Sequence, residues 1–241
     1  MRKEDYNIQD FLEVRLDWSH TFRIIPSRFP PINFFEDLVD AALMEELFHI
    51  ESLTNDRLRC EVGNLGLVQK SDRVSGKGSS VIMASFTHIS TAAPTRFSKG
   101  DFGVYYAAKT LETAIKETIY HREKFLSYTL EPACELTMRV YKSNKLLKTL
   151  VDLRRSDHPL YLQIHNPYFY TISQMIGCEL QKANAWGMVY SSVRDTQGEC
   201  VAILRPPAIP LPVTPVKHLK YVWNGQKIHH VYDIGPNILE V

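Results

Sequence analysis

Two arginines, a tyrosine and a glutamate occupy positions where polar side chains could serve a ligand. Arg23 lies in the apolar segment Phe-Arg-Ile-Ile-Pro, where a charged residue is rare unless it has a partner or a ligand. Arg96 precedes a glycine-containing turn, Tyr106 ends the next apolar segment, and Glu117 follows eleven residues later. Arginine binds anions through a planar fork of donors, and a carboxylate stabilises developing positive charge. A surface glutamate or a structural ion pair would look the same in the sequence.

The familiar signatures of other chemistries are missing. The sequence has no phosphate-binding G-x-x-x-x-G-K-[ST], no H-E-x-x-H, no G-x-S-x-G and no G-x-G-x-x-G after a strand. His229 and His230 are adjacent, and adjacent side chains on a strand point to opposite faces of a sheet. We therefore expect a solvated hairpin there and no metal site.

A strand, a turn and a helix are predicted to position the tyrosine and the glutamate. Residues 104–107 read Val-Tyr-Tyr-Ala, which is typical of a strand. From Leu111 the spacing of apolar residues changes to that of a helix, with Ala114, Ile115 and Ile119 on one face. Tyr106 is then expected at the end of the strand and Glu117 near the middle of the helix.

The remaining elements follow from the same kind of patterning. Asn33 begins a helix over about 38–48, with Glu36 three residues later as in a capping box. Residues 68–80 are polar and rich in Gly and Ser, which predicts a mobile loop. Other segments show strand alternation or helical spacing, and they predict strands at 133–142, 150–153, 187–190 and 200–204 and a helix over 171–185.

After Arg205 the character of the chain changes. Five prolines between 206 and 215 argue against regular ladders, and Asn224-Gly225 favours a hairpin turn beyond them. This tail is too short to bury a core of its own. The sequence therefore predicts one compact α+β domain over 1–205, with a Pro-rich segment and hairpin, 206–241, appended to it.

Composition and charge narrow the class of protein. The 241 residues include 28 Lys and Arg and 27 Asp and Glu, which leaves a net charge of +1 and no reason to expect nucleic-acid or membrane-surface binding. The four cysteines are widely spaced and are expected to be reduced and mostly buried. We find no signal peptide and no apolar run long enough to span a bilayer, so a cytoplasmic protein is expected.

Four blocks in order along the chain resemble the RES-domain family. RFSKGDFGVYYAAKTLETAIKE resembles its central signature, in which an arginine-bearing turn leads to a Y-x-A strand and a TAxxE helix. The FRI segment with Arg23 resembles the block with the family's first arginine, and YTISQMIGCELQKANAWGMVYSSVR resembles its serine-bearing helix and Y-x-S strand. The resemblance covers about Thr21 to Pro206. It departs at 94–98, where Pro-Thr-Arg-Phe-Ser replaces the Gly-Gly-Arg-Trp-Asn of many members.

The resemblance implies a toxin of a bacterial toxin–antitoxin pair, with a fold like the ADP-ribosyltransferase core. Such proteins consume NAD by glycohydrolysis or phosphorolysis, so NAD is the substrate and no resident cofactor is expected. The implied partner is a helix-turn-helix, Xre-like antitoxin, and a homodimer is compatible with the sequence. A protein ADP-ribosyltransferase, and a non-catalytic binding protein that keeps the fold, are the alternatives.

The family's residues carry over to named positions. Its arginine, tyrosine and glutamate match Arg23, Tyr106 and Glu117, with Tyr105 as the competing tyrosine. Ser173 and Ser192 both stay open for the serine, with Thr171 near the first of them. The implied roles are oxocarbenium stabilisation for the glutamate, nicotinamide stacking for the tyrosine and pyrophosphate binding for the arginine. Arg96 and the serine hydroxyls would add hydrogen bonds to the bound dinucleotide.

Overall fold

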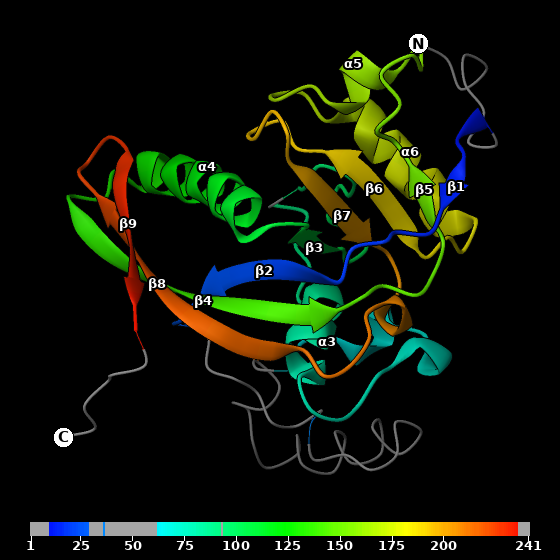
Figure 1. Cartoon of the computed structure of the whole chain (residues 1–241), viewed down its shortest axis with the longest axis horizontal. Coiled ribbons are helices and arrows are strands. Elements are labelled where there is room, and N and C mark those ends of the chain that lie inside the picture. The colour runs from blue at the N-terminus through cyan, green and yellow to red at the C-terminus, as the bar shows by residue number, and fades with distance from the viewer. Residues whose placement is uncertain (1–9, 29–35, 37–61, 93, 236–241) are drawn as a thin grey trace.

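The computed structural model describes residues 10–28, 36, 62–92 and 94–235 (Figure 1). These residues form a sheet with the strand order β1-β5-β6-β7-β3-β2-β4-β8-β9. All neighbouring strands are antiparallel except β5 and β6. The strands are β1 Glu13–Val14, β2 His20–Pro26, β3 Tyr105–Ala108, β4 Cys134–Asn144, β5 Leu150–Asp152, β6 Gly187–Ser191, β7 Glu199–Ile203, β8 Thr214–Trp223 and β9 Ile228–Ile234.

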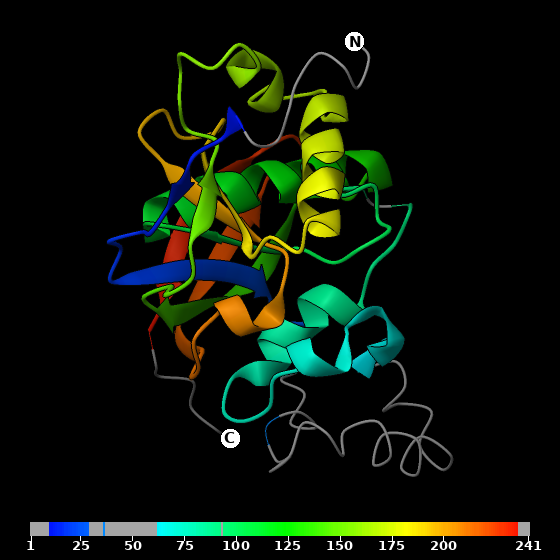
Figure 2. The ribbon, with the colours of Figure 1, turned by 90° about the vertical axis from the view of Figure 1, so that its right-hand side faces the viewer.

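Helices pack on both faces of this sheet. Helices α4 and α6 lie on one face and α3 lies on the other (Figures 1 and 2). Ala114 and Ile176 belong to the first core, and Ile82 and Phe86 to the second. The fold is thus a mixed α+β domain built on one large sheet. The helices are α3 Ser79–Thr87, α4 Leu111–Thr129, α5 Tyr161–Ile164 and α6 Thr171–Lys182, with short 3-10 helices η4 Leu65–Leu67, η5 Lys70–Asp72 and η6 Pro206–Ala208.

Strands β2 and β3 separate soon after they meet. They share a single register pair, Phe22 with Ala108, whereas β2 pairs with β4 along all seven of its residues. Strand β3 pairs with β7 over its full length. Each of the two separating strands is therefore held by its other neighbour, and the sheet opens between β2 and β3. This opening brings Arg23 and Tyr106 to a gap in the middle of the sheet.

The predicted strand, turn and helix around the candidate residues are confirmed. Strand β3 covers Tyr105–Ala108, and the Thr110 side chain caps α4 by accepting a hydrogen bond from the Thr113 N–H at 3.1 Å. The other predicted strands correspond to β4, β5, β6 and β7, and the predicted helix over 171–185 corresponds to α6. For these elements the local pattern of apolar residues was a sufficient guide.

The expectation of a mobile loop over 68–80 is wrong. Lys70–Asp72 form η5, α3 begins at Ser79, and Asp72 and Arg73 are buried. Arg205 donates two hydrogen bonds to the Asp72 carboxylate, each 2.7 Å long. This bidentate pair, formed across 133 residues, holds a locally polar segment against the domain.

The C-terminal tail is part of the main sheet. The hairpin turns at Asn224-Gly225 as predicted, but β8 already begins at Thr214 and pairs with β4 along most of its length. Pro215 lies within β8, next to a register shift opposite Tyr141, which is where a strand tolerates proline. The prolines therefore do not prevent a ladder, contrary to expectation, and Trp223 is fully buried.

Some expectations have only a partial outcome. The helix predicted from Asn33 and the thiol of Cys60 lie outside the described residues. Of the three described cysteines, all free thiols, Cys200 is buried while Cys134 and Cys178 are half-buried. In the described part of the chain, no helix is both long enough and apolar enough to cross a membrane.

Candidate active site

A cavity of about 470 Å³ opens between β2, β3 and the inner face of α4. Four of the predicted residues line it: Arg23, Arg96, Tyr106 and Glu117. Arg122 adds a third guanidinium to the wall. Three arginines face one carboxylate in this lining, so the cavity favours a ligand that carries negative charge.

The Glu117 carboxylate is held in one orientation by Ser192. The Ser192 hydroxyl donates to Glu117 Oε1 at 2.6 Å, and its oxygen accepts the backbone N–H groups of Arg194 at 3.1 Å and Asp195 at 3.0 Å. Because both lone pairs of the oxygen are engaged, its proton is directed to the carboxylate. Ser192 therefore acts on the cavity through Glu117, and Glu117 is fixed as a hydrogen-bond acceptor.

Tyr106 presents its ring to the cavity with its hydroxyl already engaged. The hydroxyl donates to Thr95 Oγ1 at 2.8 Å and accepts the Phe97 N–H at 3.1 Å. Burial raises the pKa of Tyr106 to about 12, so the phenol stays neutral at physiological pH. Tyr105, the competing tyrosine, belongs to the core on the opposite face of the sheet. Tyr106 is thus suited to stacking and packing rather than to proton transfer.

Arg23 spans the gap between β2 and β3. Its Nη1 donates to the Tyr106 carbonyl at 2.9 Å, and its guanidinium carbon lies 4.6 Å from the centre of the Tyr105 ring. Its Nε is buried without a hydrogen-bond partner, and no described carboxylate pairs with it. Burial lowers the pKa of Arg23. A buried arginine with an unused donor is what a site for an anionic group requires.

Arg96 connects the turn before β3 to the loop before α6. Its Nη1 donates to the carbonyls of Ile164 at 3.1 Å and Asn166 at 3.0 Å, and its guanidinium lies over the Tyr170 ring at 4.6 Å. The turn itself packs closely on α6, because a side chain at Gly177 would come within 2.0 Å of the Phe97 carbonyl oxygen. Arg96 therefore fixes the cavity wall as well as contributing charge to it.

Ser173 lies away from the cavity. It is fully buried at the start of α6, and its hydroxyl donates to the Tyr170 carbonyl at 3.0 Å. Thr171, near it in the sequence, is exposed. The sequence left two serines as candidates. The structure brings Ser192 to Glu117, whereas Ser173 is buried at the start of α6.

Several residues around the cavity were missed by sequence reasoning. Gln174 donates to the Thr95 carbonyl at 2.9 Å, and His121 and Tyr170 line the wall. His121 follows Glu117 by four residues on α4, and that helical spacing is the one local signal that could have identified it. Tyr170 lies beside Arg96 only in the tertiary structure, so no local signal in the sequence links the two residues.

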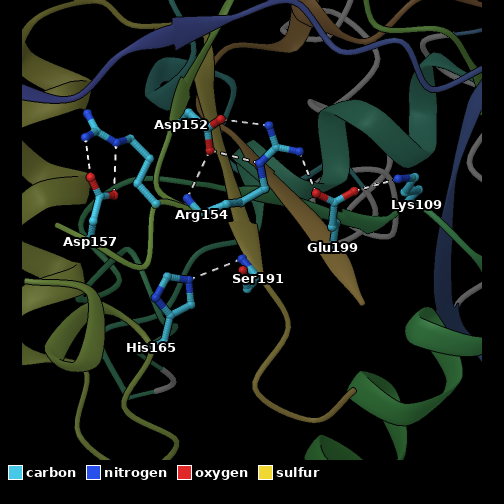
Figure 3. Close-up of polar contacts among 8 residues, drawn as sticks. Lys109, Asp152, Arg154, Asp157, His165, Ser191 and Glu199 are labelled. Carbon is cyan, nitrogen blue, oxygen red and sulfur yellow. Dashed lines mark hydrogen bonds and ion pairs between the residues drawn. The ribbon is translucent and has the colours of Figure 1, made fainter. Parts of the chain in front are cut away.

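A network of ion pairs lies apart from the cavity, on the side of the sheet formed by β5 and β7 (Figure 3). Arg154 pairs with Asp152 at 2.7 Å and with Glu199 at 2.5 Å, and Glu199 also pairs with Lys109 at 2.6 Å. Burial raises the pKa of Asp152, but the hydrogen bonds from Arg154 outweigh it and bring the pKa below its usual range. Each charge in this network has an opposite charge beside it, so the network joins β5 and β7 to the end of β3.

His165 supports the segment that carries Ser192. Its Nδ1 lies 2.9 Å from the Tyr161 carbonyl, and its Nε2 accepts the Ser191 N–H at 3.2 Å (Figure 3). This tautomer uses both ring nitrogens, and burial lowers the pKa of His165. Among the described residues, no group of three or more His, Cys, Asp or Glu side chains is arranged to hold a metal ion.

A family model agrees with the resemblance in the sequence. The RES domain model matches residues 71–224, which include β3, α4 and the Ser192 segment. An uncharacterized protein, y4oC, of Sinorhizobium fredii (strain NBRC 101917 / NGR234) is 30% identical over 225 residues, covering 90% of this chain and 92% of that protein. A solved chain of the M. tuberculosis MbcT–MbcA toxin–antitoxin complex is 11% identical with a TM-score of 0.37, covering 54% of this chain and 72% of that one. On the extent of the domain match, this chain belongs to the RES-domain family.

Proposed function

We propose that this chain is a toxin that degrades NAD by cleaving the bond between nicotinamide and ribose. One observation carries the proposal: Glu117, oriented by Ser192, lines the same cavity as Tyr106 and as Arg23, which pairs with no described carboxylate. Membership of the RES-domain family supports it. In this proposal NAD is the substrate and the fold is related to the ADP-ribosyltransferase core.

The proposed reaction needs only groups that line the cavity. The bond from ribose C1′ to the pyridinium nitrogen breaks, its electron pair stays on nitrogen, and neutral nicotinamide leaves. The Glu117 carboxylate stabilises the positive charge that develops on the ribose. The oxygen of water or phosphate then bonds to C1′ and releases a proton, giving ADP-ribose or its 1-phosphate.

The cavity walls fit the other parts of the dinucleotide. Arg23 and Arg122 can each offer planar donors to a pyrophosphate, and Arg96 adds a third positive charge to the same lining. The Tyr106 ring can stack on nicotinamide while its hydroxyl stays bound to Thr95. A ligand with an aromatic ring and two phosphates therefore suits the cavity better than a neutral metabolite.

Product analysis tests the proposed reaction. Purified protein is incubated with NAD in phosphate-free buffer, in phosphate buffer and with bacterial lysate proteins, and the products are separated by chromatography and mass spectrometry. If water is the acceptor, we expect free nicotinamide and ADP-ribose in both buffers. If phosphate is the acceptor, we expect free nicotinamide and ADP-ribose 1-phosphate only where phosphate is present. ADP-ribose attached to protein would support the transferase alternative, and intact NAD in all three would contradict both activities.

A partner must control an enzyme that drains NAD from its own cell. We propose a helix-turn-helix antitoxin in this role and the cytoplasm as the site of action, on the basis of the family resemblance. Expression of the chain alone in a bacterium is then expected to stop growth and lower cellular NAD. Co-expression of the small protein encoded beside it should restore both. Normal growth and unchanged NAD with soluble protein present would exclude the toxin role.

A further inference from the structure

The turn between β6 and β7, residues 192–198, contacts helix α4 along one of its faces. Three side chains of the turn make these contacts, and each reaches a different place on the helix. Residues three or four apart in the sequence lie on the same face of a helix. The contacted residues have this spacing: Thr113, Lys116, Glu117 and Tyr120. The turn and this face of α4 are therefore joined over two turns of helix.

Asp195 makes the contact nearest to the start of α4. The Thr113 hydroxyl donates to Asp195 Oδ2 at 2.7 Å, and Lys116 Nζ lies 3.1 Å from Asp195 Oδ1. The hydrogen bond from Thr113 lowers the pKa of Asp195, so the carboxylate is charged at neutral pH. Both of its oxygens are thus bound to the helix.

The hydrogen bond from Thr113 to Asp195 has a fixed direction. The Thr110 oxygen accepts the Thr113 N–H at 3.1 Å, so the Thr110 hydroxyl can donate to Thr113 Oγ1, which lies 2.8 Å away. The Thr113 proton then points to Asp195. The turn also packs tightly here, because a Cβ atom at Gly198 would come within 2.6 Å of Thr113 Cγ2. The turn and the helix therefore meet in one defined arrangement.

The same turn carries the serine that orients Glu117. The Ser192 hydroxyl donates to Glu117 at 2.6 Å and its oxygen accepts the Asp195 N–H at 3.0 Å. The Asp195 side chain binds Thr113, which precedes Glu117 by one turn of helix. Asp195 is thus connected to Glu117 by two routes, one through Ser192 and one through α4. This closed ring of contacts prevents the turn and the helix from shifting independently.

We propose that Asp195 is a positioning residue for the proposed reaction, which holds Ser192 and Glu117 together so that the carboxylate faces the reacting ribose. This inference rests on the proposed function. Catalytic groups must be held within about 0.5 Å of their productive position, and a displacement of about 1 Å can lower the rate 100-fold. The alternative is that Asp195 only stabilises the start of α4, as acidic residues near a helix N-terminus do.

Kinetics of the full chain separate these two roles. Asp195→Ala should lower kcat by about 10–100-fold. It should leave the KM for NAD nearly unchanged, because Asp195 is not among the described residues that line the cavity. Asp195→Asn should recover most of the kcat, since the amide oxygen can still accept the Thr113 hydroxyl. Asp152→Ala is the matched control: its side chain is 17% exposed against 13% for Asp195, and its loss should reduce stability without changing kcat. Equal kcat values for the two alanine variants would overturn the proposal.

Thr113→Val tests the same contact from the side of the helix and keeps the carboxylate. It removes the donor while preserving the shape of the side chain, so it should lower kcat as Asp195→Ala does. Amide hydrogen exchange gives a readout apart from activity: the N–H of Asp195 should exchange faster in Thr113→Val than in the unmodified chain. Unchanged exchange and unchanged kcat in an active chain would exclude positioning by Asp195. An unmodified chain that releases no nicotinamide would instead exclude the proposed function, and with it any role of Asp195 in that reaction.

Discussion

The charged residues of the cavity and those of the ion-pair network differ in whether an opposite charge lies beside them. In the network, Arg154 has two carboxylates within 2.7 Å, and every charged member has an opposite charge beside it. In the cavity, Arg23 contacts a carbonyl and an aromatic ring, and its buried Nε has no hydrogen-bond partner among the described residues. One region uses its charges to hold strands together. The other keeps a charge that no described carboxylate balances.

Under the proposed function, this difference separates residues that stabilise the fold from residues that bind a ligand. Removing one member of a satisfied pair leaves the other charge uncompensated, so it lowers stability. Removing an arginine that has no carboxylate partner relieves a desolvation cost, so it need not lower stability at all. Stability and activity should therefore respond differently in the two regions.

The largest expected effect is on turnover, from Glu117→Gln. The amide keeps the shape of the side chain and can still accept the Ser192 hydrogen bond, but it loses the charge that stabilises the ribose cation. We expect nicotinamide release to fall by about 10²–10³-fold, or about 2.7–4 kcal/mol of transition-state stabilisation. The melting temperature should change little.

Glu112→Gln is the matched control on the same helix. Glu112 is exposed and pairs with Lys116 at 2.8 Å on the surface of α4. Its turnover should equal that of the unmodified chain. If Glu117→Gln turned NAD over as fast as this control, Glu117 would have no catalytic role.

Arg23→Met is expected to weaken NAD binding by about 10–100-fold, the value of one or two hydrogen bonds to a charged group. Methionine fills similar space and carries no charge, so the free energy of unfolding should stay the same or rise. Binding titrations beside thermal melts measure both effects. A variant that binds NAD normally but melts early would identify Arg23 as a structural residue.

Arg154→Met should show the reverse pattern. It leaves Asp152 and Glu199 without their main partner, so we expect a loss of about 1–2 kcal/mol, discounted because the network is partly exposed. NAD binding should be unchanged, because the network lies apart from the cavity. Urea denaturation measures the loss, and equal stability of the variant and the unmodified chain would show that the network contributes nothing measurable.

The smallest expected effect is a change in the pH dependence of stability at His165. Its folded-state pKa is lowered, so between the unfolded value of about 6.5 and the folded value the unfolded chain binds more protons. Stability contributed by the neutral ring is therefore present above about pH 6.5 and is lost as the pH falls below it. His165→Gln should flatten the decline in melting temperature between about pH 7.5 and 5.5. An unchanged slope would show that His165 does not cause it.

The sequence was informative where structure depends on neighbouring residues. The change from strand to helix spacing predicted β3 and α4. These two elements place Tyr106 and Glu117 at the same cavity. The hairpin was predicted from Asn224-Gly225. For the strand and the helix, a buried face imposes its period on the local sequence, whereas the hairpin follows from the turn preference of Asn-Gly.

Distant contacts explain what the sequence could not predict. The segment at 68–80 resembles a loop in sequence because the contact that orders it comes from Arg205, far along the chain. Pro215 resembles a strand breaker, but a register shift beside it accommodates the proline. The choice between Ser173 and Ser192 depends on which serine the fold brings to Glu117, 75 residues before Ser192. Local pattern carries no information on such pairs.

Equilibrium binding of NAD to the Glu117→Gln protein tests the central claim most directly, because this variant should bind the dinucleotide without consuming it. Isothermal titration should show one NAD bound per chain, weaker binding when Arg23→Met is added, and little binding of nicotinamide riboside, which lacks the pyrophosphate. Failure of NAD to bind, or equal affinity for NAD and nicotinamide riboside with and without Arg23, would show that the unpaired arginine is not kept for a pyrophosphate.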